Sequence, residues 1–314
     1  MGNKRIGVIC GGSGSSKFVT ALANYFRGSK INGKSLSGFV PNVADNFWYH
    51  ALYVCPDIDI ITYALSEKLD TSKGWGVAFD TFNFLKALGE ASGREEWFQL
   101  GDKDLATSVL RTELINQGRT LSQITNFFRK RLGISYPIAP ATDDRVQTYI
   151  KTAAGMMHLQ EFWVRDKGRP AVIDVEYSGI EKAHANKQAV KLCRDFVVIC
   201  PANPVTSILP TVKLKEFGGA LKKAKVLAIS PFLGERAFSG PAAKLMRAIR
   251  MESSSFGVAK LYSSFLNILL VEQKEDPKII RKIEDIGIEC IRTQITIGSE
   301  KEKQIVAKEI VNAI

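Results

Sequence analysis

The amino-acid sequence predicts an α/β fold of the doubly wound, Rossmann-like kind, with a mostly parallel sheet, a helical insertion and a small β layer. Short apolar runs rich in β-branched residues, such as Arg5–Cys10 and Phe196–Cys200, are typical of buried strands. Each run is followed by small residues or glycines and then by helical spacing, the order that produces parallel strands. Between about residues 80 and 135 the pattern is predominantly helical, which predicts the insertion.

Length and composition favour a single soluble domain over residues 1–314, with the insertion inside it. The chain is 45% apolar and 24% charged, and no apolar run reaches the ~18 residues that a membrane helix needs. The five cysteines are widely spaced in apolar runs, which indicates reduced, buried thiols. We therefore expect a cytoplasmic protein with no membrane partner.

The charge balance points to an anionic ligand. The 43 Lys and Arg residues outnumber the 32 Asp and Glu residues, for a net charge of +11. Nucleic acid, an anionic membrane or a small polyanion would each suit this balance. The basic residues are dispersed, and no basic arm, zinc-finger spacing or RNA-binding aromatic motif accompanies them. We expect no nucleic-acid partner and a small-molecule substrate that carries phosphate.

A glycine-rich turn follows the first predicted strand. Gly11–Lys17 reads GGSGSSK and leads into helical spacing over Phe18–Phe26. Backbone N–H groups at such a helix start bind phosphate, which makes Gly11, Gly12, Ser13 and Gly14 candidate phosphate ligands. Ser15, Ser16 and Lys17 could add donors. The alternative is a generic tight turn, because the loop matches neither a Walker A motif nor GxGxxG.

Carboxylates and aromatic residues are concentrated in the stretch NVADNFWYHALYVCPDID at 42–59. A second predicted strand, Ser37–Val43, delivers Asp45 to the sheet edge where the glycine turn lies, and ligands bind at that edge in open α/β sheets. Asp57 and Asp59 precede a helical pattern over Ile60–Leu69, so one of them could be an N-cap. The mixture favours a pocket that holds a cation and a flat ligand.

The rest of the chain is predicted in the same way. The insertion holds helices, and a β layer of two strands follows it. The core then resumes with further strands, with Asn203, Ser207, Ser239 and Gly240 at turns where they could meet a nucleotide, although an αβ turn explains each singly. The expected helices are Thr81–Leu88, Lys103–Gly118, Leu121–Leu132 and Glu300–Ile314; the expected strands are Met157–Val164, Ala171–Tyr177, Lys225–Ser230 and Phe265–Val271.

Taken in order, the motifs resemble the 2-phospho-L-lactate transferase family of deazaflavin coenzyme F-420 biosynthesis, known as CofD in archaea and FbiA in bacteria. The resemblance covers nearly the whole chain. Besides the two motifs above, it rests on WG…DT at 75–81, LGDKDLAT at 100–107, PATDDRVQT at 140–148, MHLQEFWV at 157–164, NPVTSI at 203–208 and SP…SGPAAKLM at 230–246.

The resemblance implies a reaction. A 2-phospholactyl or phosphoenolpyruvyl group would pass from a diphosphoguanosine donor to the ribityl hydroxyl of 7,8-didemethyl-8-hydroxy-5-deazariboflavin. GMP would be released, with Mg²⁺ as cofactor. It also implies a homodimer, but the sequence does not identify the three-carbon acid.

The resemblance also suggests roles for residues. Asp57 and Lys103 match positions associated with the deazaflavin, and we add Asp102, Trp48 and Thr81 to that pocket. Gly11–Gly14, Asn203 and Ser207 are expected to bind the phosphates and guanosine. Asp45, Asp57 and Asp59 are expected to act in catalysis and to hold Mg²⁺. This chain departs from the family pattern at Asn46, where an acid is usual, and at Ile60, where threonine is usual.

Two other functions fit parts of the sequence. A non-enzymatic regulator that binds nucleotide sugars would share the fold and a similar glycine loop, but LGDKD and PDID argue against it. An NAD-dependent dehydrogenase lacks its full fingerprint here. His158 lies in an apolar run where a core role is expected, and no metal-ligand spacing surrounds His50.

Overall fold

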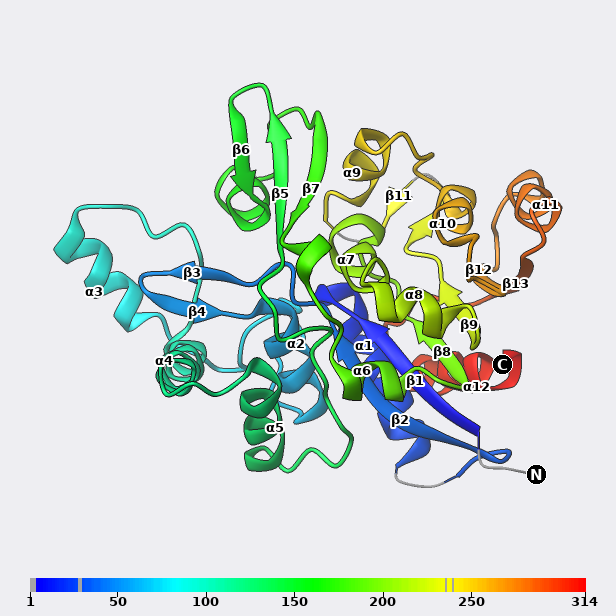
Figure 1. The fold of residues 1–314 in the computed structure, drawn as a ribbon, viewed down its shortest axis with the longest axis horizontal. Coiled ribbons are helices and arrows are strands. Elements are labelled where there is room, and N and C mark those ends of the chain that lie inside the picture. The colour runs from blue at the N-terminus through cyan, green and yellow to red at the C-terminus, as the bar shows by residue number, and fades with distance from the viewer. Residues whose placement is uncertain (1–3, 28–29, 235, 239) are drawn as a thin grey trace.

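A six-stranded parallel sheet forms the centre of the computed structural model, which describes residues 4–27, 30–234, 236–238 and 240–314 (Figure 1). The strand order β13-β12-β9-β8-β1-β2 places β1 in the interior, so the expected mostly parallel α/β sheet is confirmed. The strands are β1 (Lys4–Cys10), β2 (Lys34–Pro41), β8 (Phe196–Ile199), β9 (Lys225–Ile229), β12 (Ile268–Glu272) and β13 (Glu289–Thr293).

Helices cover both faces of this sheet, which confirms the doubly wound class. Alternate residues of β1 show why: Ile6 and Val8 pack in one apolar core and Ile9 in another. The first core includes α1 (Gly12–Phe26) and α12 (Glu300–Ala313). The second includes α6 (Lys187–Leu192), α8 (Lys215–Leu221), α9 (Ala242–Ala248), α10 (Ser255–Tyr262) and α11 (Pro277–Asp285), with the short α7 (Leu209–Val212).

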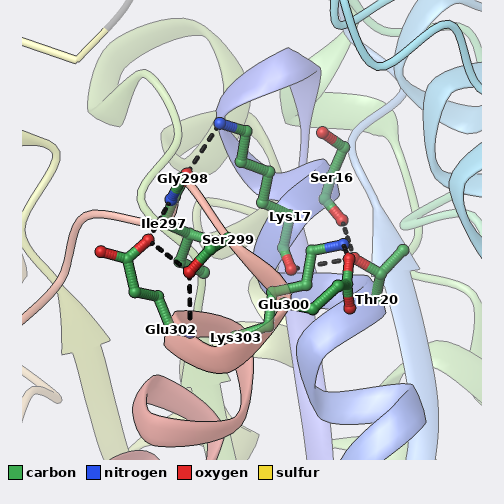
Figure 2. A network of polar contacts seen from close by, with 9 residues as sticks. All are labelled: Ser16, Lys17, Thr20, Ile297, Gly298, Ser299, Glu300, Glu302 and Lys303. Atoms are coloured by element: carbon green, nitrogen blue, oxygen red, sulfur yellow. Dashed lines mark hydrogen bonds and ion pairs between the residues drawn. The ribbon is translucent and has the colours of Figure 1, made fainter.

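The helix that follows the glycine turn is tied to the C-terminal helix. Lys17 Nζ donates to the carbonyl of Ile297 at 2.8 Å, just ahead of α12 (Figure 2). Ser299 caps α12 by accepting from the Glu302 N–H, and the Glu302 carboxylate accepts from Gly298 N–H. Lys17 is therefore committed to an anchoring contact, and the expectation that it supplies a donor at the turn is not supported.

The region between β2 and β8 begins with a hairpin that the sequence did not reveal. Strands β3 (Phe47–Tyr49) and β4 (Leu52–Val54) pair through a two-residue turn in which His50 and Ala51 have φ of 48° and 60°. Glycine and asparagine usually occupy such positions, so the usual turn signal was missing. The helices α2 (Pro56–Leu65), α3 (Asn83–Ser92), α4 (Asp102–Asn116) and α5 (Leu121–Arg131) follow.

A separate antiparallel sheet, in the order β6-β5-β7, lies beside the main sheet (Figure 1). It consists of β5 (Gln147–Thr152), β6 (Gly155–His158) and β7 (Asp174–Ser178). The expected strand over Met157–Val164 is wrong beyond His158, because the chain turns into a π-helix at Glu161–Arg165. The Glu161 carboxylate accepts from the His158 N–H at 3.0 Å and closes this turn. Within the described ranges, no helix is long and apolar enough to cross a membrane.

Candidate active site

A cavity of about 620 Å³ opens where the carboxyl ends of β1, β2 and β8 meet. Segments far apart in the sequence contribute to it, as expected for the ligand edge of an α/β sheet. Its lining comprises Gly11–Gly14, Asp45, Pro56, Asp57, Ile60, Trp75, Phe98, Gln99, Leu159, Gln160, Trp163, Val164, Lys167, Ala202, Asn203, Thr206, Ser207, Gly240 and Pro241.

The glycine turn forms the first turn of α1. The helix begins at Gly12, not at Phe18 as expected, so the N–H groups of its first turn lack intrahelical acceptors beside the cavity. Gly11 sits so close to its neighbours that a Cβ there would lie 2.8 Å from Asp57 Oδ2 and 2.9 Å from Ser207 Cβ. Only glycine fits at this point, between two walls of the cavity.

The two serines that follow do not point donors at the cavity. Ser15 is fully buried; its hydroxyl donates to the Gly11 carbonyl at 2.8 Å and accepts from the Gly11 N–H at 3.0 Å. Ser16 Oγ donates to the carbonyl of Ser13 at 2.9 Å. Both hydroxyls therefore brace the turn, and the expectation that they add phosphate donors is not supported.

Asp57 and Asp45 form a buried pair of carboxylates at the cavity. Helix α2 begins at Pro56, so Asp57 lies in its first turn rather than ahead of it. Asn42 Nδ2 donates to Asp57 Oδ2 at 2.9 Å and to the Thr206 carbonyl at 3.3 Å. Asp45 is 6% exposed, and its Oδ1 has no hydrogen-bond partner among the described residues.

Burial makes ionisation of this pair costly. It raises the pKa of Asp57 to about 6, although the bonds from Asn42 and the Gly12 N–H oppose the rise. Burial also raises the pKa of Asp45 well above its usual range, with a further contribution from the nearby charge of Asp57. Two carboxyl groups with raised pKa values in a cavity are typical of a catalytic or cation-binding site.

The opposite wall comes from the segment after β8. The Asn203 side chain accepts from the N–H groups of Val205 at 3.0 Å and Thr206 at 3.4 Å, and so caps a π-helix over Pro204–Ile208. This π-helix brings Ser207 within reach of the glycine turn. The residues expected to bind nucleotide, Gly11–Gly14, Asn203 and Ser207, are thus brought together in one cavity. Ser239 lies outside the described residues.

Several lining residues were not predicted. Trp75, Phe98 and Trp163 supply aromatic surface, and Trp163 is 41% exposed. Trp163 belongs to the π-helix at Glu161–Arg165, so both π-helices of the described chain border the cavity. Interruptions of this kind occur frequently at functional sites. An apolar run in a presumed strand offered no signal that Trp163 would face a ligand.

Asp59 does not join Asp45 and Asp57. It lies two residues after Asp57 on α2, about 200° around the helix axis, and faces away from the cavity. There it forms an ion pair with Arg111, which is only 1% exposed and also donates to the Tyr53 carbonyl at 3.2 Å. No group of three or more His, Cys, Asp or Glu residues in the described ranges could hold a metal ion. The expected three-carboxylate metal set is therefore not assembled.

Other residues expected around the deazaflavin also lie elsewhere. Trp48 is 44% exposed in β3, and neither Trp48, Thr81, Asp102 nor Lys103 lines the large cavity. Thr81 Oγ1 donates to Asp102 Oδ2 at 2.5 Å, and Lys103 Nζ donates to the Phe79 carbonyl at 2.9 Å. Lys103 also lines a second cavity of about 360 Å³, together with the Asp59–Arg111 pair. A direct contact of these four residues with the deazaflavin stays a prediction.

Asn46, where the chain departs from the family pattern, lies outside the cavity lining. Asn46 is 1% exposed and does not line the cavity; its Nδ2 donates to Tyr53 Oη at 3.4 Å. His158 accepts at Nδ1 from the Gln160 N–H at 3.2 Å, and burial lowers its pKa to about 4. His50, in the turn of the β3–β4 hairpin, has its Nε2 atom 2.6 Å from the Glu96 carboxylate. Both histidines thus have contacts within the fold.

The fold and this cavity define the class of protein. A doubly wound sheet with a glycine turn, a helix N-terminus and buried carboxylates at its carboxyl edge is typical of α/β enzymes that act on phosphorylated ligands. In fold, the chain is similar to a crystal structure of a UPF0052 family member from Bacillus halodurans, with a TM-score of 0.64 and 14% identity over 99% of each chain.

Sequence comparison then names the family. Residues 6–311 match the family model described as 2-phospho-L-lactate transferase CofD. The chain is 34% identical over 306 residues to the 2-phospho-L-lactate transferase of Methanosarcina acetivorans, covering 97% of each chain. It is 33% identical over 318 residues to that of Methanopyrus kandleri, covering 99% of this chain and 98% of the relative. The chain belongs to the CofD family and is a transferase, which confirms the resemblance found in its motifs.

Proposed function

We propose that the protein transfers a 2-phospholactyl or phosphoenolpyruvyl group from a diphosphoguanosine donor to the ribityl hydroxyl of a 5-deazaflavin, and releases GMP. The observation that supports this most directly is the pair of buried carboxylates, Asp45 and Asp57, beside a glycine turn in one cavity. Family membership supplies the reaction class, and the cavity supplies groups suited to each part of it.

The donor's diphosphate is proposed to lie on the glycine turn. The first-turn N–H groups of α1 carry the positive end of the helix dipole, and the absence of side chains lets phosphate oxygens approach the backbone. Asn203 and Ser207 on the facing wall would contact the guanosine part of the donor. Asn203 caps the π-helix at Pro204–Ile208, and Ser207 lies within it.

The carboxylate oxygens of Asp45 and Asp57 are suitable ligands for Mg²⁺ in this cavity. Asp45 Oδ1 is buried without a partner among the described residues, and a cation would satisfy it. Two protein carboxylates are enough, because Mg²⁺ usually keeps waters and binds substrate phosphates in its other positions. Bound there, the ion would offset negative charge on the diphosphate during transfer.

The reaction would proceed by attack of the ribityl oxygen on the outer phosphorus. An O–P bond forms, the bond from that phosphorus to the GMP oxygen breaks, and the hydroxyl proton passes to a base. Asp57 is the proposed acceptor of that proton: burial raises its pKa only to about 6, and a cation beside it would lower that pKa, so the carboxylate is ionised at neutral pH. Asn42 holds the carboxylate in position through its 2.9 Å hydrogen bond. The flat deazaflavin ring would pack against Trp75, Phe98 or Trp163.

Product analysis by mass spectrometry tests the proposal. The purified protein is incubated with Mg²⁺, the 5-deazaflavin and, in parallel, the lactyl, enolpyruvyl and glyceryl diphosphoguanosines. We expect a deazaflavin phosphodiester and an equal amount of GMP from at least one donor, which would also identify the three-carbon acid. Absence of product from all three, with tight binding of a uridine diphosphate sugar instead, would contradict the proposal and favour a nucleotide-sugar-binding regulator.

A further inference from the structure

The large cavity contains more acidic than basic side chains, although the proposed substrate is an anion. Of the described residues that line it, those with charged side chains are Asp45, Asp57 and Lys167. A diphosphate donor of the proposed function brings several negative charges. Its phosphates would be served by the N–H groups of the glycine turn and by a cation on the two aspartates. Among the described residues of the cavity wall, the carboxylate of its three-carbon acid is then left with one cationic side chain, that of Lys167.

The backbone around Lys167 is shaped to present this side chain. Lys167 follows the π-helix at Glu161–Arg165 and adopts φ of 54°, which is uncommon for a residue with a side chain, and Gly168 follows with φ of 62°. A Cβ on Gly168 would lie 3.1 Å from the Trp163 ring, so the turn closes tightly over that tryptophan. Lys167 and Trp163 therefore reach the cavity from one compact unit.

A second lysine fixes this unit to the rest of the fold. Lys244 Nζ, on α9, donates to the carbonyls of Gly168 at 2.7 Å and Arg169 at 3.0 Å. The side chain of Lys244 is thus used structurally. That of Lys167 is exposed and makes no hydrogen bond or ion pair with another described residue. A left-handed backbone costs free energy, of order 1 kcal/mol or more, and persists where the surroundings enforce it, often at ligand sites.

We propose that Lys167 is a substrate-binding residue that recognises the carboxylate of the donor's three-carbon acid. This proposal rests on the proposed function. Through Lys167, the enzyme would bind a donor that carries the carboxylate more tightly than one that lacks it. An ammonium group at the end of a flexible stem forms a charge-assisted hydrogen bond with a carboxylate, the stronger class of such bonds. The phosphates remain bound by the glycine turn, so Lys167 acts on the acid end of the donor.

The test compares two donors on four proteins. The first donor is the one that the wild type uses best; the second is its analogue with an ethyl group in place of the acid, which keeps both phosphates and guanosine. The proteins are the wild type, Lys167→Met, Lys167→Arg and the control Lys151→Met, which changes an exposed lysine of β5 outside the cavity. Lys167→Met keeps the stem and should fold with an unchanged unfolding midpoint.

We expect Lys167→Met to raise KM for the carboxylate donor about 10- to 100-fold, the loss typical of a hydrogen bond to a charged group. KM for the ethyl analogue, KM for the deazaflavin and the inhibition constant of GDP should stay within about twofold. Lys167→Arg should recover most of the loss, and Lys151→Met should behave as wild type. Equal losses on both donors, or none on either, would overturn the assignment.

Failure of the proposed function would be recognised separately. If the wild type turns over no donor, calorimetric binding of lactyl diphosphoguanosine and its ethyl analogue to the wild type and to Lys167→Met still tests the lysine. Preferential binding of the carboxylate compound, lost in Lys167→Met, would support the carboxylate contact without turnover. Equal binding of both compounds to the wild type, or a preference that survives in Lys167→Met, would overturn it.

Discussion

Replacing Asp57 by Asn should lower turnover by orders of magnitude and stabilise the protein at the same time. The mutation removes the proposed proton acceptor, which typically costs 10²- to 10⁴-fold in kcat. It also removes a charge from a buried position. Burial raises the pKa of Asp57 from its ordinary 3.8 to about 6. At about 1.4 kcal/mol per pKa unit, ionised Asp57 costs the folded state about 3 kcal/mol, an upper value for the gain in stability.

The direction in which stability changes with pH follows from how tightly each state binds the Asp57 proton. The folded state holds the Asp57 proton more tightly than the unfolded state, so this group's contribution is intact below pH 3.8, falls as the pH rises to about 6, and stays low above it. Urea unfolding with chelator present should show Asp57→Asn more stable than wild type, by more at pH 8 than at pH 5. In the wild type with Mg²⁺ beside Asp57, the cation favours the ionised carboxylate, so the fall of kcat/KM on the acid side should lie below pH 6.

A matched control lies on the same helix. Burial raises the pKa of Asp59 as well, against the pull of Arg111, but Asp59→Asn leaves that guanidinium buried without its anion. It should therefore destabilise the protein by about 3–5 kcal/mol while leaving Asp57 in place. Opposite signs for two aspartates two residues apart would support the placement of Asp57 in the cavity and of Asp59 outside it. If Asp57→Asn stays fully active, or unfolds more easily than wild type at pH 8, the reasoning about Asp57 is refuted.

Two further substitutions test the glycine turn and its anchor. Gly11→Ala should reduce kcat/KM strongly and lower the free energy of unfolding by about 1–3 kcal/mol, because the new Cβ would meet Asp57 and Ser207. A variant with unchanged kinetics would contradict this packing. Lys17→Met should lose about 1 kcal/mol of stability with unaltered kinetic constants, because the Lys17 amine bonds the Ile297 carbonyl. Faster amide hydrogen exchange at the start of α12 would report the lost contact. A change in KM for the donor substrate would instead indicate that Lys17 contacts substrate.

Topology explains which parts of the site were predictable. In a parallel sheet the carboxyl ends of neighbouring strands meet, so Gly11–Gly14 after β1 and Asn203–Ser207 after β8 had to converge once those strands were recognised. Asp45 follows β2 and arrives at the same edge. These placements needed only strand positions, which apolar runs reveal well.

Side-chain direction and long-range pairing were beyond the same reasoning. Helix α2 begins at Pro56, and that start decides that Asp57 enters the cavity while Asp59 turns away to a partner 52 residues along the chain. No sequence pattern near Asp59 predicts its ion pair with Arg111. The π-helix that brings Trp163 to the cavity likewise depends on tertiary contacts rather than on the pattern of the run. The homodimer stays a prediction.

The interior position of β1 has a consequence for how the protein is made. Strand β1 lies between β2 and β8, and Arg5 N–H bonds the Asp195 carboxylate across a separation of 190 residues. At ~5–20 residues per second, translation takes about 10–40 s to supply that partner. The glycine turn therefore emerges early but cannot be completed until β8 has left the ribosome, so the apolar first strand must wait with one edge unpaired. A nascent chain stalled before residue 196 is expected to need a chaperone and to bind no nucleotide.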